Sequence, residues 1–135
     1  MIAPLSALYA GLLALLLLAL AGRVSLLRSK LNVGLDHAND PALARAIRVH
    51  GNAVEWIVPM LVLFVVAEID GANRTFLHLC GVVFLVSRIA HAAGLSRGSK
   101  ASSSRFWGTA GSWLVIVALA LWDLRAFLRT LPRFG

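Results

Sequence analysis

The stretch RVHGNAVEWIVPMLVLFVVAE, from Arg48 to Glu68, decides the fold. Its polar opening, which contains Asn52 and Glu55, leads directly into an apolar run from Ile57 to Ala67. An apolar run of this length that continues a helical pattern indicates a membrane-spanning helix. The stretch therefore predicts a spanning helix that carries charged groups near one of its ends.

The composition of the whole chain indicates a membrane protein. The 135 residues are 59% hydrophobic and only 14% charged, and the mean hydropathy is +0.82. A soluble domain of this length cannot bury so much apolar surface. The net charge of +7 comes from basic residues that cluster at the ends of apolar segments, as the positive-inside rule requires. Because no basic surface is interleaved with aromatic residues, we exclude nucleic acid as a partner.

Four apolar segments predict an all-α integral membrane four-helix bundle. The expected spans cover about residues 4–27, 41–68, 73–95 and 104–127, each with enough residues to cross the hydrocarbon layer. They form a single domain over residues 1–135. Asp40 caps the second span ahead of Pro41, and a tight turn over residues 70–73 makes the second and third spans antiparallel neighbours.

Two details of the apolar segments have simple interpretations. Residues 19–21 (Ala-Leu-Ala) resemble a signal-peptide cleavage site, but no basic residue precedes Arg23. We therefore expect the first segment to be retained as a span. Cys80 lies inside the third segment, where we expect a small core residue and not a nucleophile.

The distribution of Lys and Arg predicts the orientation. The first and third connections with their flanks carry the larger set: Arg23, Arg28, Lys30, Arg45, Arg97, Lys100 and Arg105. The opposite side carries Arg74, Arg125, Arg129 and Arg133. The positive-inside rule places the first and third connections in the cytoplasm and both termini outside.

Polar residues of two spans meet at one depth. At 100° per residue, one face of the second span carries Arg45, Arg48, Asn52 and Glu55 within an arc of about 80°. Arg88 and His91 of the third span are three residues apart and share a face as well. At 1.5 Å per residue, Glu55 and Arg88 each lie about 20 Å from the outer turn.

Two interpretations of this cluster remain open. Glu55 and Arg88 can form a salt bridge that joins two helices. Alternatively, because one carboxylate cannot neutralise Arg48, Arg88 and the nearby Arg105, the excess charge binds an anion with carboxylates, which arginine grips bidentately. Ionisable groups inside spans favour a functional interpretation. We expect no metal, since paired His or Cys ligands are lacking and arginines surround the one carboxylate.

The motifs resemble a known family. The string Arg-x-His-x-Asn-x-x-Glu-x-x-x-Pro begins at Arg48, and Arg88-x-x-His91 precedes Gly94. Four spans with these motifs resemble the MAPEG superfamily, the membrane-associated proteins in eicosanoid and glutathione metabolism, and a bacterial-type member in particular. The resemblance implies a homotrimer of left-handed four-helix bundles in the bacterial inner membrane, with glutathione as cosubstrate at the subunit interfaces.

The resemblance also implies roles for individual residues. Those that would bind glutathione are Arg28, Arg48, Asn52, Glu55, Arg88 and His91. Arg105 would be catalytic, by stabilising the thiolate that attacks a lipophilic electrophile from the bilayer. The implied activity is that of a glutathione transferase or peroxidase.

Two departures from the family pattern motivate an alternative. Gly51 stands where some eicosanoid-metabolising members have an arginine, and Leu95 stands where they have a tyrosine. The alternative is a non-catalytic member that binds lipid or acts as a scaffold. We disfavour a small transporter, because four spans with one polar cluster lack a charge relay across the membrane.

Overall fold

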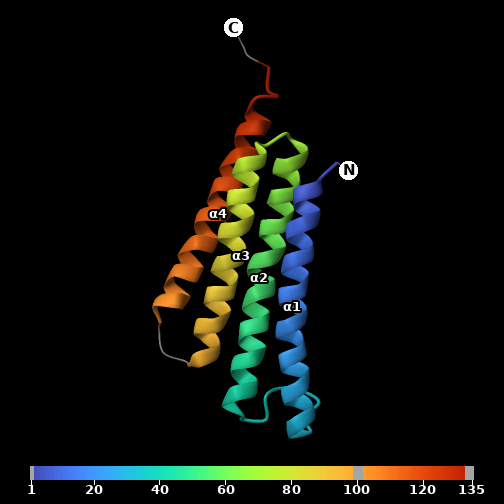
Figure 1. Ribbon diagram of the computed structural model, residues 1–135, viewed down its shortest axis with the longest axis vertical. Coiled ribbons are helices and arrows are strands. Elements are labelled where there is room, and N and C mark those ends of the chain that lie inside the picture. Colours follow the sequence, from blue (N-terminus) through green and yellow to red (C-terminus); the bar gives the residue numbers. More distant parts are fainter. Residues whose placement is uncertain (1, 99–101, 133–135) are drawn as a thin grey trace.

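The computed structural model describes residues 2–98 and 102–132 and consists of four long helices. They are α1 (Pro4–Leu31), α2 (Pro41–Ile69), α3 (Arg74–Arg97) and α4 (Ser103–Leu128). Each helix is long and apolar enough to cross a membrane, which confirms the predicted all-helical, four-span architecture. Figure 1 shows that α1 begins and α4 ends at the end of the bundle that holds the α2–α3 turn.

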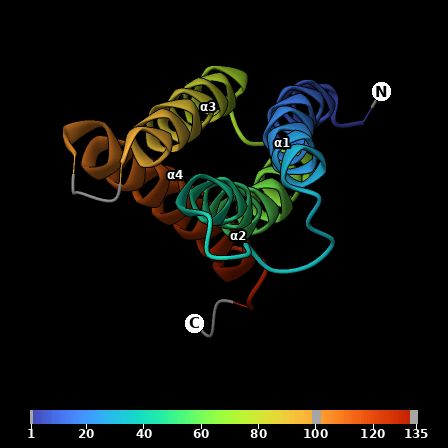
Figure 2. The same ribbon diagram turned by 90° about the horizontal axis from the view of Figure 1, so that it is seen from below.

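The order of packing puts α2 and α3 in the middle of the bundle. α4 packs mainly on α3 and also contacts α2, whereas α1 packs mainly on α2 and also contacts α3. Within the described residues α1 does not pack on α4, and the two lie apart in the view along the bundle (Figure 2). A side chain on α1 and one on the start of α4 are therefore held by different pairs of helices.

Local capping sets the helix starts that the sequence predicts. The Oδ1 atom of Asp40 accepts hydrogen bonds from the backbone N–H groups of Ala42 and Leu43, at 2.9 and 2.7 Å, which confirms the predicted cap. Asn73 caps α3 in the same way. The turn between α2 and α3 is tight because Gly71 adopts a positive φ of 81°, which glycine tolerates without strain.

The first helix is longer than its apolar segment. α1 continues through Arg28 and Lys30 to Leu31 and ends at Asn32, whose φ of 53° is left-handed. Polar residues with good helix propensity extend a helix beyond the hydrocarbon layer at little cost. The apolar pattern therefore marks the part of α1 that lies in lipid, whereas a turn residue marks where the helix ends.

The start of α1 is capped by a residue from a different helix. α1 has no capping side chain of its own. Instead, the carboxylate of Glu68 accepts hydrogen bonds from the N–H of Leu5 at 2.8 Å and from the N–H and hydroxyl of Ser6, both at 2.6 Å. A carboxylate at a helix N-terminus satisfies free N–H groups and also complements the helix dipole. Glu68 thus joins the C-terminal end of α2 to the start of α1.

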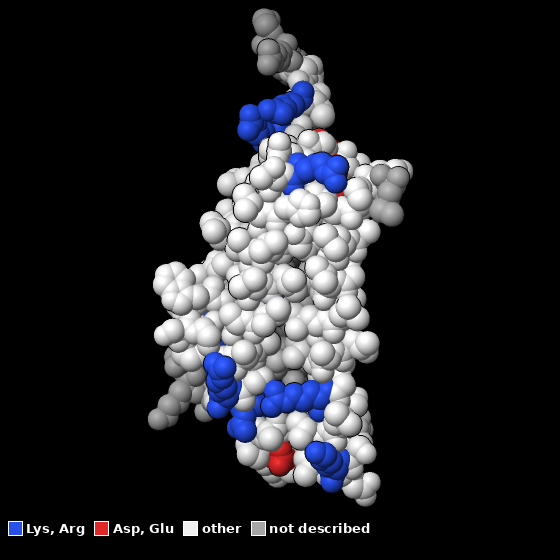
Figure 3. All heavy atoms as spheres, in the orientation of Figure 1, with Lys and Arg blue, Asp and Glu red and all other residues white. Residues whose placement is uncertain are grey.

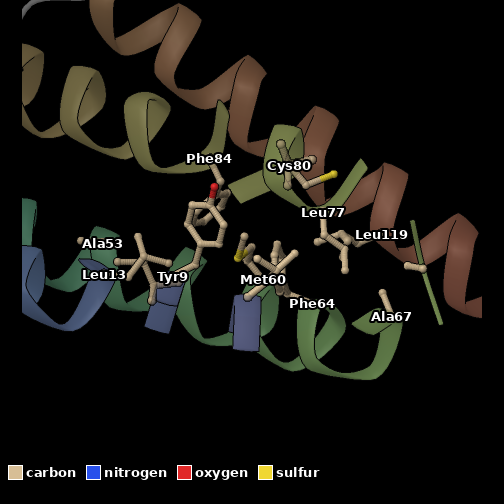
Figure 4. Close-up of a cluster of buried hydrophobic side chains, with 14 residues drawn as sticks. Tyr9, Leu13, Ala53, Met60, Phe64, Ala67, Leu77, Cys80, Phe84 and Leu119 are labelled. Carbon is tan, nitrogen blue, oxygen red and sulfur yellow. The ribbon is translucent and has the colours of Figure 1, made fainter. Parts of the chain in front are cut away.

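A core cluster fills the half of the bundle nearer the α2–α3 turn with side chains from all four helices (Figure 4). Tyr9 of α1 packs on Phe64 of α2, with ring centroids 5.5 Å apart. Met60 and Phe84 are fully buried in the same cluster. Cys80 is 6% exposed, so the prediction that it is a core residue is confirmed.

The charged surface agrees with a membrane location. Figure 3 shows that Lys and Arg gather toward the two ends of the visible face, with an uncharged belt between them. Large apolar side chains of all four helices are exposed around this belt, among them Leu15, Val62, Val86 and Leu121. Such a surface is stable only in contact with lipid or with other apolar helices.

Candidate functional site

Arg88 is a buried cation without a charged partner. It lies on α3, is 2% exposed and is the largest fully buried side chain described. Its Nη2 atom donates a long hydrogen bond of 3.5 Å to Oδ1 of Asn52, and its Nε atom has no partner among the described residues. Among the described residues, no carboxylate lies within ion-pair distance of the Arg88 guanidinium. A buried cation in this state has strong residual affinity for an anion.

A chain of polar contacts leads from Arg88 to the exposed face of α2. The amide of Asn52 donates from Nδ2 to Oε2 of Glu55 at 3.4 Å. Oε1 of Glu55 in turn accepts from Nη1 of Arg48, also at 3.4 Å. The structure therefore brings together Arg48, Asn52, Glu55 and Arg88, four of the five polar residues that the second and third spans were predicted to contribute.

The pairing of Glu55 differs from one of the two interpretations of the sequence. Glu55 forms its ion pair with Arg48 on its own helix, whereas Arg88 reaches Asn52. The side chain of Glu55 is exposed on α2, whereas Asn52 reaches Arg88 of α3. The interpretation of Glu55 and Arg88 as a salt bridge between two helices is wrong for this arrangement.

A close approach of α3 and α4 brings a second part of the site into reach. A Cβ atom at Gly108 would lie 2.6 Å from the backbone oxygen of Ser87 and 2.7 Å from the backbone nitrogen of His91. Only glycine allows two helix backbones to come this close. As a result, the first turns of α4 lie directly against the stretch of α3 that carries Arg88 and His91.

A cavity of about 280 Å³ opens at this contact. It is lined by His91 of α3 together with Ser102, Arg105, Phe106 and Thr109 at the start of α4. His91 and Arg105 line the same cavity, and Arg88 lies three residues before His91 on the same face of α3. A helix N-terminus with a basic side chain in its first turn attracts anions. The cavity and the buried Arg88 therefore form one electropositive region at the α3–α4 contact.

Arg28 lies apart from this region within one chain. Its guanidinium donates from Nη1 to the carbonyl of Gly34 at 3.1 Å, in the connection that follows α1. Since α1 does not pack on α4, the fold of one subunit does not bring Arg28 to Arg105. The prediction that both bind one ligand would require Arg28 to come from a neighbouring copy.

Two polar residues that line the cavity at the α3–α4 contact were not predicted from the sequence. Ser102 and Thr109 line the cavity, and Ser102 also caps α4 by accepting from the N–H of Arg105 at 3.4 Å. A serine directly before an apolar helical pattern is an N-cap signal that could have located Ser102. No pattern marks Gly108, because its role depends on the helix that packs against it.

Within the described ranges, no three His, Cys, Asp or Glu side chains gather as a metal site would require. The site instead combines a buried guanidinium, a second arginine at a helix start and an exposed Arg–Glu pair. Such donors can hold the carboxylates of a small anion, while Asn52 and Glu55 can receive its amide and amino groups.

Comparisons with known proteins agree with these features. The model of the MAPEG family matches residues 6–124, which run from the first turn of α1 into α4. The chain is 36% identical over 119 residues to inner membrane protein YecN of Escherichia coli strain K12, which covers 88% of this chain and 89% of that protein. YecN of Escherichia coli O6:H1 matches to the same extent. The motif resemblance is thus confirmed, and the chain belongs to the MAPEG family.

Proposed function

We propose that the protein binds glutathione through the electropositive region of α2, α3 and α4. The observation that carries the proposal is Arg88, a guanidinium that is 2% exposed and has no carboxylate within ion-pair distance in the described part of the chain. Glutathione carries two carboxylates, and a guanidinium binds a carboxylate bidentately. A bound carboxylate would supply the counter-charge that the described residues do not provide.

The other predicted residues have roles that suit the shape of glutathione. Arg48 and Arg88 hold its carboxylates, with Arg28 of an adjacent copy as a third basic group. Asn52 and Glu55 receive its amide and amino groups, and His91 lines the region between them. In this proposal the Arg48–Glu55 pair opens when the ligand binds.

We further propose a homotrimer with sites between its subunits. The side chains of Arg48 and Glu55 are 67% and 53% exposed, although Glu55 lies about 21 Å along α2 from the outer turn at 1.5 Å per residue. A charged pair that faces outward at that depth requires cover from protein or from a water-filled cleft. A neighbouring subunit that closes the site supplies such cover.

The proposed chemistry is a glutathione transfer or a peroxide reduction. Arg105 lies at the start of α4, where a cation favours the thiolate over the thiol. Bound glutathione supplies this thiolate as the nucleophile, and the lipophilic electrophile enters from the bilayer. We place the protein in the inner membrane, as YecN is named, with the α1–α2 and α3–α4 connections in the cytoplasm.

A glutathione titration of the purified protein in nanodiscs tests the proposal. We expect a saturable rise in thiolate ultraviolet absorbance that Arg105→Ala abolishes. The matched control is Arg97→Ala, which removes an exposed arginine at the end of α3 and leaves the signal unchanged. An absence of binding at millimolar glutathione contradicts the proposal.

One observation favours a non-catalytic member as the alternative. Leu95 is 9% exposed and packs with Val49 and Ala92 in a small apolar cluster, so no hydroxyl stands where other members have a tyrosine. A lipid-binding or scaffold protein on the same fold would bind its ligand without turnover. Saturable glutathione binding without a thiolate signal supports this alternative.

A further inference from the structure

A second polar cavity lies at the opposite end of the bundle from the candidate site. It has a volume of about 460 Å³ and opens between the end of α2 and the last turns of α4, where Val66, Asp70, Trp122, Asp123, Arg125 and Arg129 line it. At 1.5 Å per residue, Asp123 lies about 27 Å along α4 from Arg105. The two sites are thus at opposite membrane interfaces.

This cavity contains two buried groups that the described chain leaves without a hydrogen bond. Both carboxylate oxygens of Asp123 and the Nε1 atom of Trp122 are buried and have no partner among the described residues. Asp70 adds a second negative charge that acts on Asp123. Buried polar groups are nearly always satisfied, because an unsatisfied group has lost its hydrogen bonds to water without gaining a partner. A cationic hydrogen-bond donor would satisfy the carboxylate of Asp123, and a hydrogen-bond acceptor would satisfy the indole N–H of Trp122.

Basic residues line the same cavity. Arg125 on α4 and Arg129 directly after its end line the cavity and are exposed. The cavity thus presents acidic groups beside basic ones. A ligand that matches both carries an ammonium and a phosphate a few bonds apart, since arginine binds phosphate and a carboxylate binds an ammonium.

An apolar groove adjoins this cavity through one aromatic pair. The ring of Trp122, which lines the cavity, stacks on Phe76 with centroids 5.4 Å apart. Phe76 in turn lines a groove of about 290 Å³ between α3 and α4 that is walled by Leu79, Val83 and Leu114. A groove with only apolar walls on a spanning helix pair fits an acyl chain.

We propose that this end of the bundle binds one aminophospholipid, with its headgroup in the polar cavity and an acyl chain in the groove. The primary ammonium donates to Asp123 and lies near Asp70. The phosphate pairs with Arg125 and Arg129 and accepts from the indole N–H of Trp122. The lipid therefore satisfies the two buried groups that the described residues leave unpaired.

Native mass spectrometry of the delipidated protein tests the assignment. Dioleoyl phosphatidylethanolamine, dioleoyl phosphatidylcholine and dioleoyl phosphatidylglycerol are added in separate titrations, and free phosphoethanolamine in a fourth. We expect selective retention of the ethanolamine lipid, because the quaternary ammonium of choline cannot donate a hydrogen bond. Asp123→Asn should weaken this retention about tenfold, as the loss of one charge-assisted hydrogen bond implies.

Two further variants provide a control for Asp123→Asn and a separate test of the groove. Asp36→Asn removes an exposed carboxylate in the α1–α2 connection and should leave lipid retention unchanged. Ala118→Phe fills the groove and should weaken retention of the lipid. Equal retention of all three lipids, an unaffected Asp123→Asn variant, or free phosphoethanolamine binding as tightly as the lipid each overturns the assignment. The last outcome is that the protein shows no lipid selectivity and that Asp123→Asn changes its oligomeric state. This result would mean that Asp123 contacts a second copy of the chain, and it would overturn the lipid assignment as well.

Discussion

Arg88 shows how one residue can be unfavourable for folding and yet suited to binding. Its guanidinium is removed from water, is held by one long hydrogen bond to Asn52 and lacks a carboxylate partner in the described chain. Replacing an unpaired buried charge by an apolar side chain of similar length is neutral or stabilising. Ligand binding responds differently: removing a cation that pairs with a carboxylate of the ligand weakens the affinity.

We therefore predict opposite effects of Arg88→Met on stability and on binding. The free energy of unfolding in detergent should stay the same or rise, while glutathione affinity should fall at least about tenfold. Chemical unfolding and a glutathione titration of the same preparation measure the two quantities. The control is Arg97→Met, which should change neither. A marked loss of stability in Arg88→Met would make the arginine a structural residue.

Glu68 gives the reverse prediction, a stability effect without a binding effect. Glu68→Ala removes the three hydrogen bonds that cap α1 at Leu5 and Ser6. Loss of a helix cap costs roughly 1–2 kcal/mol, so the unfolding midpoint should fall while glutathione affinity is retained. Asp36→Asn removes a carboxylate that is exposed, tolerates the left-handed φ of 55° at this position, and serves as the comparison. Equal stability of the two variants would contradict the role of the cap.

At the scale of helices, the contact between α3 and α4 depends on Gly108. Gly108→Ala places a methyl group 2.6 Å from a backbone oxygen of Ser87, and a backbone cannot rotate away as a side chain can. We predict a loss of about 1–3 kcal/mol in stability. Glutathione affinity should also weaken, because α4 carries Arg105 away from α3.

Gly22→Ala provides the matched control for this prediction. Gly22 lies inside α1, and a Cβ atom there would meet nothing within 4 Å. Since alanine favours a helix interior over glycine by about 1 kcal/mol, this variant should be as stable as the parent or more so. If both alanine variants unfold alike, the close approach at Gly108 is not what holds α3 to α4.

The elements that the sequence predicts are those that depend on neighbours in the chain. The Asp40 cap, the turn at Gly71 and the burial of Cys80 follow from local pattern, and the structure has all three. The partners of Arg88 and Glu68 lie far away in the sequence. Helical periodicity gives the face and the depth of such a residue, but which side chain it meets depends on how two helices are rotated against each other.

At the scale of the assembly, the separation of α1 from α4 makes a prediction about mixed oligomers. If one glutathione contacts both Arg28 and Arg105, the two residues come from different subunits. Arg28→Ala and Arg105→Ala should each weaken thiolate formation in a pure homotrimer. Co-expression of the two variants should restore it at about a quarter of the sites, as random mixing in a cyclic trimer implies. No recovery in purified mixed oligomers would exclude shared sites.

The proposed orientation can be tested with introduced cysteines. Thr75→Cys places a thiol beside the α2–α3 turn, and Ser103→Cys places one at the start of α4; both native residues are exposed. The native Cys80 is buried and should give little background. A membrane-impermeant maleimide should label Thr75→Cys in intact cells and Ser103→Cys only after permeabilisation. The opposite pattern would invert the topology.

The cap on α1 has a consequence for the order in which the protein is made. The first helix emerges from the ribosome with free N–H groups at Leu5 and Ser6, and the carboxylate that binds them arrives with residue 68. During synthesis, the cap on α1 can therefore form only after the second span has crossed the membrane and has brought Glu68 to the end at which α1 begins. A nascent chain halted between the two spans carries an open helix end that only continued translation can close.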